Sequence, residues 1–198
     1  MHEEKNYPAY FAATLLALAG LSAQAAPVDY RIDPEHTEVV VTWDHLGFSK
    51  PTAHAGGVTG VVRYDAASPA DSAVDLRIPV SKLTSHVPKL DGMLQGVQFF
   101  EAARYPDIRF KSTSVTDRGD GRLQIDGILR IKGIDKPVVL QARRNGQGMH
   151  PMAQRPAIGF DATTTLKRSD FGVDAFAPDV SDEVQLRITI EAVAEAAR

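Results

Sequence analysis

The chain of 198 residues contains no cysteine. Disulfide bonds, thiolate metal sites and cysteine nucleophiles are therefore excluded. Charges of neither sign dominate, with 22 Lys and Arg against 25 Asp and Glu, and no run of basic residues forms a patch for a polyanion. Aromatic residues are scarce, and tryptophan occurs once. Nothing in this composition indicates a nucleic-acid partner.

The remaining composition is that of an ordinary globular protein. Hydrophobic residues make up 43% of the chain and charged residues 24%, and the net charge is −3. These values predict a chain that builds one good core. No repeat, low-complexity tract or linker divides residues 28–193, so we expect a single domain.

The N-terminus carries an apolar segment, Phe11–Leu21, followed by SAQAAP. The segment is too short to span a membrane, which takes about 20 residues. Ala23 and Ala25 fit the A-x-A pattern of a cleavage site, so residues 1–25 are predicted to be a signal peptide and residues 26–198 the mature chain. The acidic leader is atypical of export signals, and the alternative is a buried N-terminal helix. The alanine- and leucine-rich composition favours export.

Strand-like alternation begins after this segment. In VVVTWDHLGFS, residues 39–49, Val39, Val41, Trp43 and His45 share one face. Comparable alternation recurs over residues 58–64, 74–80, 107–115, 122–133, 138–142, 160–164 and 184–190. The pattern predicts about eight β-strands, each with one apolar face.

The connections predict how these strands are arranged. Turn-forming residues occupy 117–121, 132–137 and 144–148, and such short connections favour antiparallel neighbours. Residues 81–106 break the alternation and predict one or two short helices in a long crossover. Strands with one apolar face close into a barrel or stack as two sheets, and a barrel of this size is either filled by side chains or holds a small ligand. The pattern alone favours the barrel slightly.

Four stretches together resemble the YceI-like family of polyisoprenoid-binding periplasmic proteins. They are YRIDPEHTEVVVTWDHLGFS, FFEAARYPDIRFKSTSV, GILRIKGIDKPVVL and GFDATTTLKRSDFGV, in the order found in the family. The resemblance runs from about Tyr30 to Ala192. It implies an all-β, eight-stranded antiparallel lipocalin-like barrel whose elongated apolar cavity takes a polyprenyl lipid or a quinone tail. It also implies a periplasmic homodimer with no catalytic residues and no cofactor besides the bound lipid.

The chain departs from the family pattern at two places that bear on the head group of the ligand. Residues 52–55 read Thr-Ala-His-Ala where members often carry Arg-Gly-Arg-Phe, and residues 90–94 read Leu-Asp-Gly-Met-Leu where Arg-Asp-x-His-Leu is common. A dianionic head group needs paired cations. The loss of these cationic residues therefore favours a neutral head group such as a quinone ring. The candidate cations that remain are Lys50, His54, Lys89 and Arg168.

The resemblance, combined with the alternation, predicts the residues that contact the ligand. They are Val41, Trp43, His45, Val58, Val62, Phe99, Phe100, Ile108, Phe110, Phe160 and Phe171. His45 is expected near a mouth of the barrel, and Phe99 and Phe100 could equally plug one end. The same alternation fits a solid core, in which case the protein is an interaction or scaffold module. As partners we expect the isoprenoid lipid or quinone, a transient membrane contact and a second copy of the chain.

Catalytic and metal sites are not indicated. His36, His45 and His54 are spaced nine residues apart, and no acidic motif of metal-ligand spacing accompanies them. Ser169 and Asp170 beside Arg168 fit a hydrogen-bonded loop, and neither a G-x-S-x-G elbow nor a glycine-rich phosphate loop is present. We therefore expect no enzyme activity and no metal, and a metal-dependent enzyme is the least favoured alternative.

Overall fold

This computed structural model describes residues 26–195 of the chain. These residues contain eleven strands, one α-helix and three short 3-10 helices. The predicted signal peptide, residues 1–25, lies outside the described residues. In chain order the elements are β1 (Val28–Ile32), β2 (Glu38–His45), β3 (Thr52–Ala55), β4 (Thr59–Tyr64), η1 (Pro69–Asp71), β5 (Ala73–Pro79), η2 (Val80–Lys82), β6 (Leu83–Thr84), α1 (Pro88–Gln95), β7 (Asp107–Asp117), β8 (Arg122–Ile131), β9 (Ile134–Met149), β10 (Pro156–Lys167), η3 (Arg168–Phe171) and β11 (Val180–Ala194).

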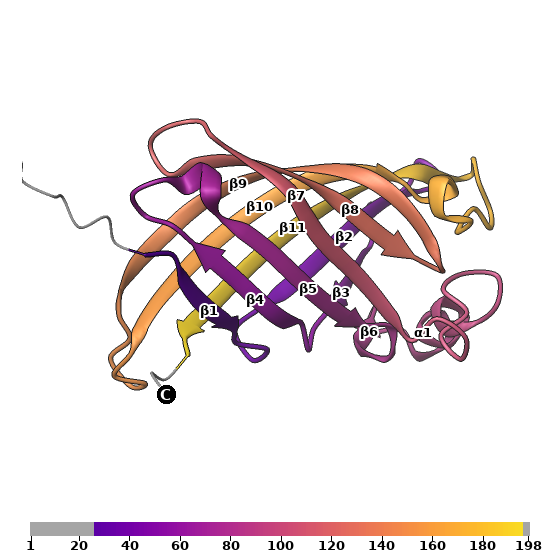
Figure 1. Ribbon diagram of the computed structural model, residues 1–198. Coiled ribbons are helices and arrows are strands. Elements are labelled where there is room, and N and C mark those ends of the chain that lie inside the picture. The colour runs from indigo at the N-terminus through magenta and orange to yellow at the C-terminus, as the bar shows by residue number, and fades with distance from the viewer. Residues whose placement is uncertain (1–25, 196–198) are drawn as a thin grey trace, which may run out of the picture.

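Eight of the strands form a closed ring (Figure 1). Their order is β1-β4-β5-β7-β8-β9-β10-β11, and β11 pairs back with β1, every pair being antiparallel. Closure leaves no free sheet edge along this ring and hides the apolar face of each strand inside it. The prediction of an all-β, eight-stranded antiparallel lipocalin-like barrel is confirmed.

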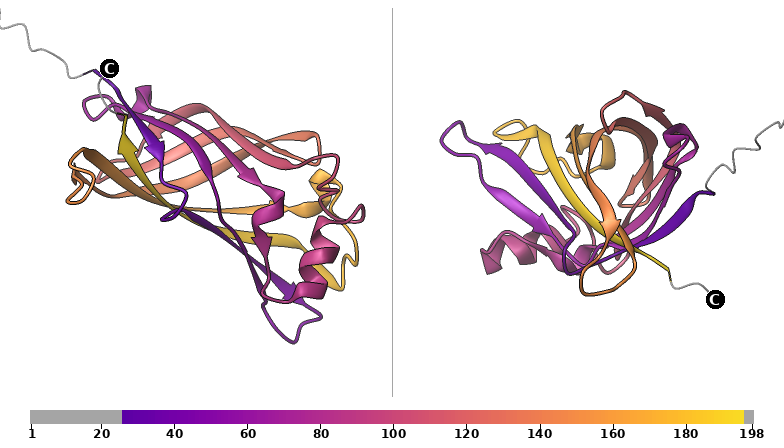
Figure 2. Two further views of the ribbon diagram at one scale, coloured as in Figure 1. Left: turned by 90° about the horizontal axis from the view of Figure 1, so that it is seen from below. Right: turned by 90° about the vertical axis from the view of Figure 1, so that its left-hand side faces the viewer.

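One edge of β11 is shared by two strands. Residues 192–194 pair with β1, whereas residues 180–189 pair with β2, which continues outward into β3 and β6. Residues 33–37 connect β1 to β2 and lie beside Glu191, because Asp33 N and the Thr37 hydroxyl both donate to the Glu191 carbonyl. Figure 2 shows the β2-β3 pair projecting from the ring near α1. The end of the barrel that carries α1 is therefore built differently from the opposite end.

The crossover contains one α-helix, α1, in agreement with the predicted one or two. Pro88 occupies its first turn, where a missing N–H costs nothing. The Asp91 carboxylate accepts hydrogen bonds from Thr84 and Ser85, which ties α1 to β6 and lowers the pKa of Asp91. Lys132 Nζ donates to the Val97 and Gly172 carbonyls, at 3.0 Å each, and so joins the crossover to the β10-β11 loop. Among the described helices, none is both long enough and apolar enough to cross a bilayer.

Two of the three predicted turns differ from the structure. Residues 118–121 form the β7-β8 turn as expected. The second turn is confined to Lys132 and Gly133, both with positive φ, and the following residues already belong to β9. The third prediction, a turn at 144–148, is wrong. There β9 continues to Met149, and Asn145 is an extra residue opposite the Gly159/Phe160 step of β10. Asn and Gly are tolerated both in β-bulges and in turns, so the sequence of residues 144–148 does not distinguish the two.

The interior of the ring is one continuous apolar core. Gly127 on β8 is required there by a close approach of Phe110 on the neighbouring strand β7. A Cβ atom at Gly127 would lie 2.4 Å from Phe110 Cζ and 2.7 Å from the Lys111 carbonyl oxygen. The missing side chain therefore gives the Phe110 ring its place in the core.

Candidate functional site

An apolar cavity of about 50 Å³ lies inside the barrel. Its lining residues belong to the half of the barrel near the β7-β8 and β9-β10 turns, which Figure 1 shows at the end opposite α1. Seven strands contribute to its wall, since the inward face of each is apolar. The lining residues are Val62, Tyr64, Ser72, Val74, Leu76, Val115, Leu123, Ile125, Leu140, Ala142, Phe160, Ala162, Ile188 and Ile190.

The size of this cavity limits what it holds without rearrangement. A water molecule needs roughly 10–15 Å³ of such space, so the cavity corresponds to about three to five water-sized groups. That is close to the five carbon atoms of one isoprene unit. Because the lining is apolar, the cavity offers a water molecule few hydrogen-bond partners and suits an apolar guest. A longer chain must displace side chains of the core.

The structure places the sequence-predicted ligand residues at different depths. Val62 and Phe160 line the cavity. The remaining predicted residues divide into the buried Val58, Ile108, Phe110 and Phe171, the partly buried Val41, Trp43, Phe99 and Phe100, and the exposed His45. Most of these residues belong to the half of the barrel that carries α1, beyond the cavity.

Phe110 lies next to the cavity wall, although it does not line the cavity itself. It pairs with Leu76, which lines the cavity, on one side and with Leu129, which does not, on the other. The ring is 4% exposed and lies against Gly127. Phe110 is therefore a buried core residue on the side of Leu76 that leads towards Ile108.

A group of polar side chains lies next to the cavity wall at Tyr64. Tyr64 lines the cavity, stacks edge-to-face on Phe160 and accepts a hydrogen bond from Arg144 Nη1 at 3.0 Å. Arg144 Nη1 also donates to Gln147 Oε1 at 3.1 Å, and Gln147 Nε2 donates to the Tyr30 hydroxyl at 3.3 Å. Sequence reasoning missed this group because it assigned residues 144–148 to a turn. The alternation of Leu140, Ala142 and Arg144 was the signal that could have found it.

An open polar hollow of about 350 Å³ adjoins this group on the outside. Its lining residues are Asp120, Gly121, Arg143, Arg144, Asn145, Gly146 and Gln147. Arg144 thus contacts the hollow through its side chain and the cavity wall through Tyr64. The hydrogen bond between these residues joins one residue of the cavity lining to one residue of the hollow lining.

The cations predicted from the sequence have other environments. Arg168 donates to the carbonyls of Val173, Ala175, Val180 and Ser181 at 2.6–2.8 Å, and burial lowers its pKa. It therefore holds the β10-β11 loop and is not available to a ligand. His54 pairs with Glu38 at 2.9 Å, and Lys50 and Lys89 are exposed on loop and helix.

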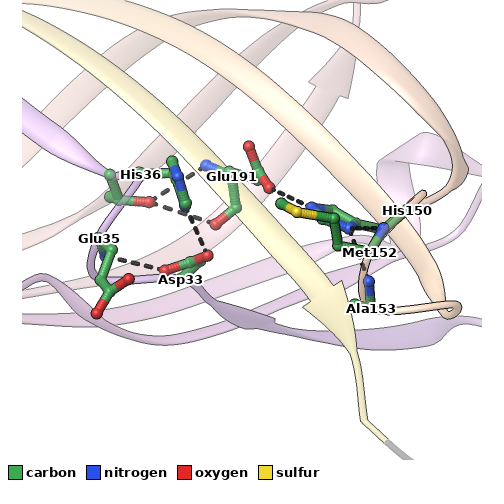
Figure 3. A network of polar contacts seen from close by, with 8 residues as sticks. Asp33, Glu35, His36, His150, Met152, Ala153 and Glu191 are labelled. Carbon is green, nitrogen blue, oxygen red and sulfur yellow. Dashed lines mark hydrogen bonds and ion pairs between the residues drawn. The ribbon is translucent and has the colours of Figure 1, made fainter.

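A polar cluster beside the β1-β2 junction contains potential metal ligands (Figure 3). Atoms of Asp33, His36 and Glu191 lie within 4.8 Å of one another. His36 Nδ1 is hydrogen-bonded to Asp33 at 2.9 Å, and His150 Nε2 to Glu191 at 3.1 Å. Because His150 Nδ1 accepts from the backbone N–H of Met152 and Ala153, its proton lies on Nε2 and is donated to Glu191. The polar groups of the cluster are thus satisfied by hydrogen bonds within it, between His36 and Asp33 and between His150 and Glu191.

Comparison with known proteins identifies the family. The model of the YceI-like domain matches residues 30–192. The chain belongs to the YceI-like family. A UPF0312 protein of Pseudomonas putida is 36% identical over 186 residues, which cover 92% of this chain and 96% of the relative.

Two solved structures have folds similar to that of this chain. The Campylobacter jejuni YceI protein is 28% identical, with a TM-score of 0.69 over 77% of this chain and 90% of the other. A polyisoprenoid binding domain from Saccharophagus degradans, implicated in plant cell wall breakdown, is 14% identical, with a TM-score of 0.61 over 85% and 99% of the two chains. At that identity the second likeness supports the fold alone.

Proposed function

We propose that this YceI-like protein is a non-enzymatic carrier that holds a long isoprenoid chain, a polyprenyl lipid or a quinone tail, inside its barrel. The observation that carries the proposal is an apolar cavity within a closed ring of strands. The polyisoprenoid-binding domain of the same fold in Saccharophagus degradans supports it.

Burial of the chain supplies the binding energy. Each buried CH₂ contributes about 0.8 kcal/mol, so one isoprene unit contributes roughly 3–4 kcal/mol. The summed burial energy of eight isoprene units would nominally exceed the ceiling for non-covalent binding, which lies at about −18 to −21 kcal/mol. Ordering the chain and displacing core side chains such as Phe110 must cancel much of this sum. Binding then needs few polar contacts.

The cellular setting is part of the proposal. Removal of residues 1–25 during export would deliver the mature chain to the periplasm, where lipid carriage requires a transient contact with a membrane. Exposed apolar side chains at the α1 end, Phe48, Val97 and Phe176, support such a contact. The homodimer implied by the family resemblance also stays a proposal, which sedimentation of residues 26–198 tests.

Cavity filling tests carriage directly. Ala162→Phe adds an apolar ring to the cavity wall without burying charge, whereas Thr163→Phe places the same ring on the outer face of β10. We expect the unmodified protein and T163F to take up a prenyl quinone, and A162F to lose most of this uptake. Extraction of the purified protein followed by mass spectrometry should recover a long-chain lipid. Ala142→Leu serves as a milder variant if A162F fails to fold.

The competing function is an interaction module whose interior is packed. The small volume of the cavity is the observation in its favour. Three results together would favour the packed module. The purified protein would contain no lipid, the unmodified chain would take up no quinone, and A162F and T163F would behave identically.

A further inference from the structure

We propose that Arg144 and Tyr64 form a head-group subsite that binds an anionic oxygen head group, a carboxylate or a phosphate, of the chain whose tail occupies the cavity. The inference rests on the proposed function. It assigns the end of the barrel opposite α1 to the head group and replaces the neutral head group that the sequence favoured.

Strand β9 carries the transition from apolar to polar surroundings. Leu140 and Ala142 line the cavity, and Arg144 follows two residues later on the same inward face. Its partner across the ladder is Phe160, which also lines the cavity. The guanidinium group therefore lies directly beyond the apolar wall.

Tyr64 links the cavity wall to Arg144. Its side chain is buried and belongs to the cavity wall, whereas its hydroxyl oxygen accepts the hydrogen bond from Arg144. The Arg144 guanidinium carbon lies 5.7 Å from the centre of the Tyr64 ring. A chain that lies against Tyr64 thus ends beside the guanidinium group.

The charge of Arg144 is not neutralised within residues 26–195. No carboxylate oxygen lies within 4.0 Å of it, and its two side-chain hydrogen bonds both start from Nη1. Nε and Nη2 are left to donate to a ligand. A guanidinium group presents paired donors that match carboxylate and phosphate oxygens.

The open hollow removes the main objection to a charged ligand. Burying an anion without a partner is costly, whereas in the hollow the head group keeps contact with water. Arg143 adds a second cation to the lining. The one carboxylate there, Asp120, is largely exposed and lies 3.4 Å from Arg122. Only the tail then needs to leave water.

Three probes with the same tail and different head groups test the subsite: geranylgeranoic acid, geranylgeranyl phosphate and geranylgeraniol. We expect the unmodified protein to bind at least one anionic probe about tenfold more tightly than the alcohol, as charge-assisted hydrogen bonds are stronger than neutral ones. Arg144→Gln should weaken the anionic probes about tenfold and change the alcohol by less than about twofold. Raised salt should reduce the preference for the anions.

The control variant is Arg187→Gln, which removes an exposed arginine from β11. It should leave all three affinities unchanged. If R144Q does not fold, Tyr64→Phe keeps the ring in the wall and removes the hydroxyl, and it should also weaken the anionic probes selectively.

Each outcome separates the subsite from the carrier function. If R144Q loses affinity only for geranylgeranoic acid, the head group is a carboxylate. If it loses affinity only for geranylgeranyl phosphate, the head group is a phosphate. Both outcomes support the subsite. Tight binding of all three probes that R144Q leaves intact, or lowers equally, overturns the subsite and leaves the carrier standing. Failure of the unmodified protein to bind any probe overturns the carrier function itself.

Discussion

Asp33 and His36 hold the β1-β2 junction together through a charged hydrogen bond. The bond to Asp33 raises the pKa of His36 above its ordinary 6.5, and the bond to His36 lowers the pKa of Asp33 below its ordinary 3.8. Both side chains lie at the surface, so the pair contributes modestly. Its contribution depends on pH because both groups must be ionised.

Replacing His36 by Gln should make stability less dependent on pH. The contribution of His36 is full below pH 6.5 and is lost as the pH rises through its raised folded-state pKa, whereas that of Asp33 is full above pH 3.8 and is lost as the pH falls through its lowered pKa. The pair therefore stabilises the fold between these values. Melting temperatures of both proteins at pH 5.5 and pH 8.5 measure the effect.

The difference between H36Q and the unmodified protein should be larger at pH 5.5. His45→Gln, at an exposed position, provides the control. An equal difference at both pH values would show that the ion pair contributes nothing.

The Phe110 ring on β7 lies over Gly127 on the neighbouring strand β8. The ring occupies the volume that any larger residue at position 127 would need. The sequences of β7 and β8 therefore depend on each other at this contact, because the large aromatic residue on β7 requires a glycine on β8.

Gly127→Ala should destabilise the barrel by about 1–3 kcal/mol, because an added methyl group in a packed core forces neighbours to shift. Gly148→Ala on β9, where a Cβ meets nothing within 4 Å, is the matched control and should change stability by less than about 0.5 kcal/mol. Urea unfolding of both variants measures the difference. Equal stabilities would mean that Phe110 moves aside freely.

Local pattern predicted the strands because burying one face of a strand imposes a period of two on its side chains. It also marked Tyr64, Leu76 and Ile125 as inward-facing without indicating that they surround empty space. That property depends on side chains from strands distant in sequence. The Arg144 group was missed for a related reason: the bulge at Asn145 is defined only by its partner strand β10.

The barrel as a whole has two dissimilar halves. One contains the cavity and ends at the Arg144 hollow, whereas the other is filled by side chains around Phe110 and ends at α1. Trp43 belongs to the second half, since it pairs with Val184 near the start of β11. A long guest whose head group lies at the Arg144 end must pass Phe110 to reach the α1 end, where Trp43 lies on β2.

Phe110→Ala should join the two halves. We expect this variant to bind a long prenyl quinone several-fold more tightly than the unmodified protein and to show stronger quenching of Trp43, while a quinone with one isoprene unit binds both alike. The folded state should lose about 3–5 kcal/mol of stability. Fluorescence titration measures binding and depth of entry together.

Phe48→Ala, which truncates a ring that is 90% exposed, is the control. If long and short quinones bind F110A exactly as they bind the unmodified protein, Phe110 does not limit the length of the guest.

Strand β11 supplies the pairing edge for β1 and β2, yet it is the last strand in chain order. The ion pair between Arg31 and Glu195 joins positions 164 residues apart. A polypeptide that leaves the ribosome from its N-terminus therefore presents the β2 edge that pairs with β11 long before β11 emerges. Unpaired edges of this kind invite aggregation. The nascent chain must be kept from neighbours until synthesis is complete, and only then does the ring shut.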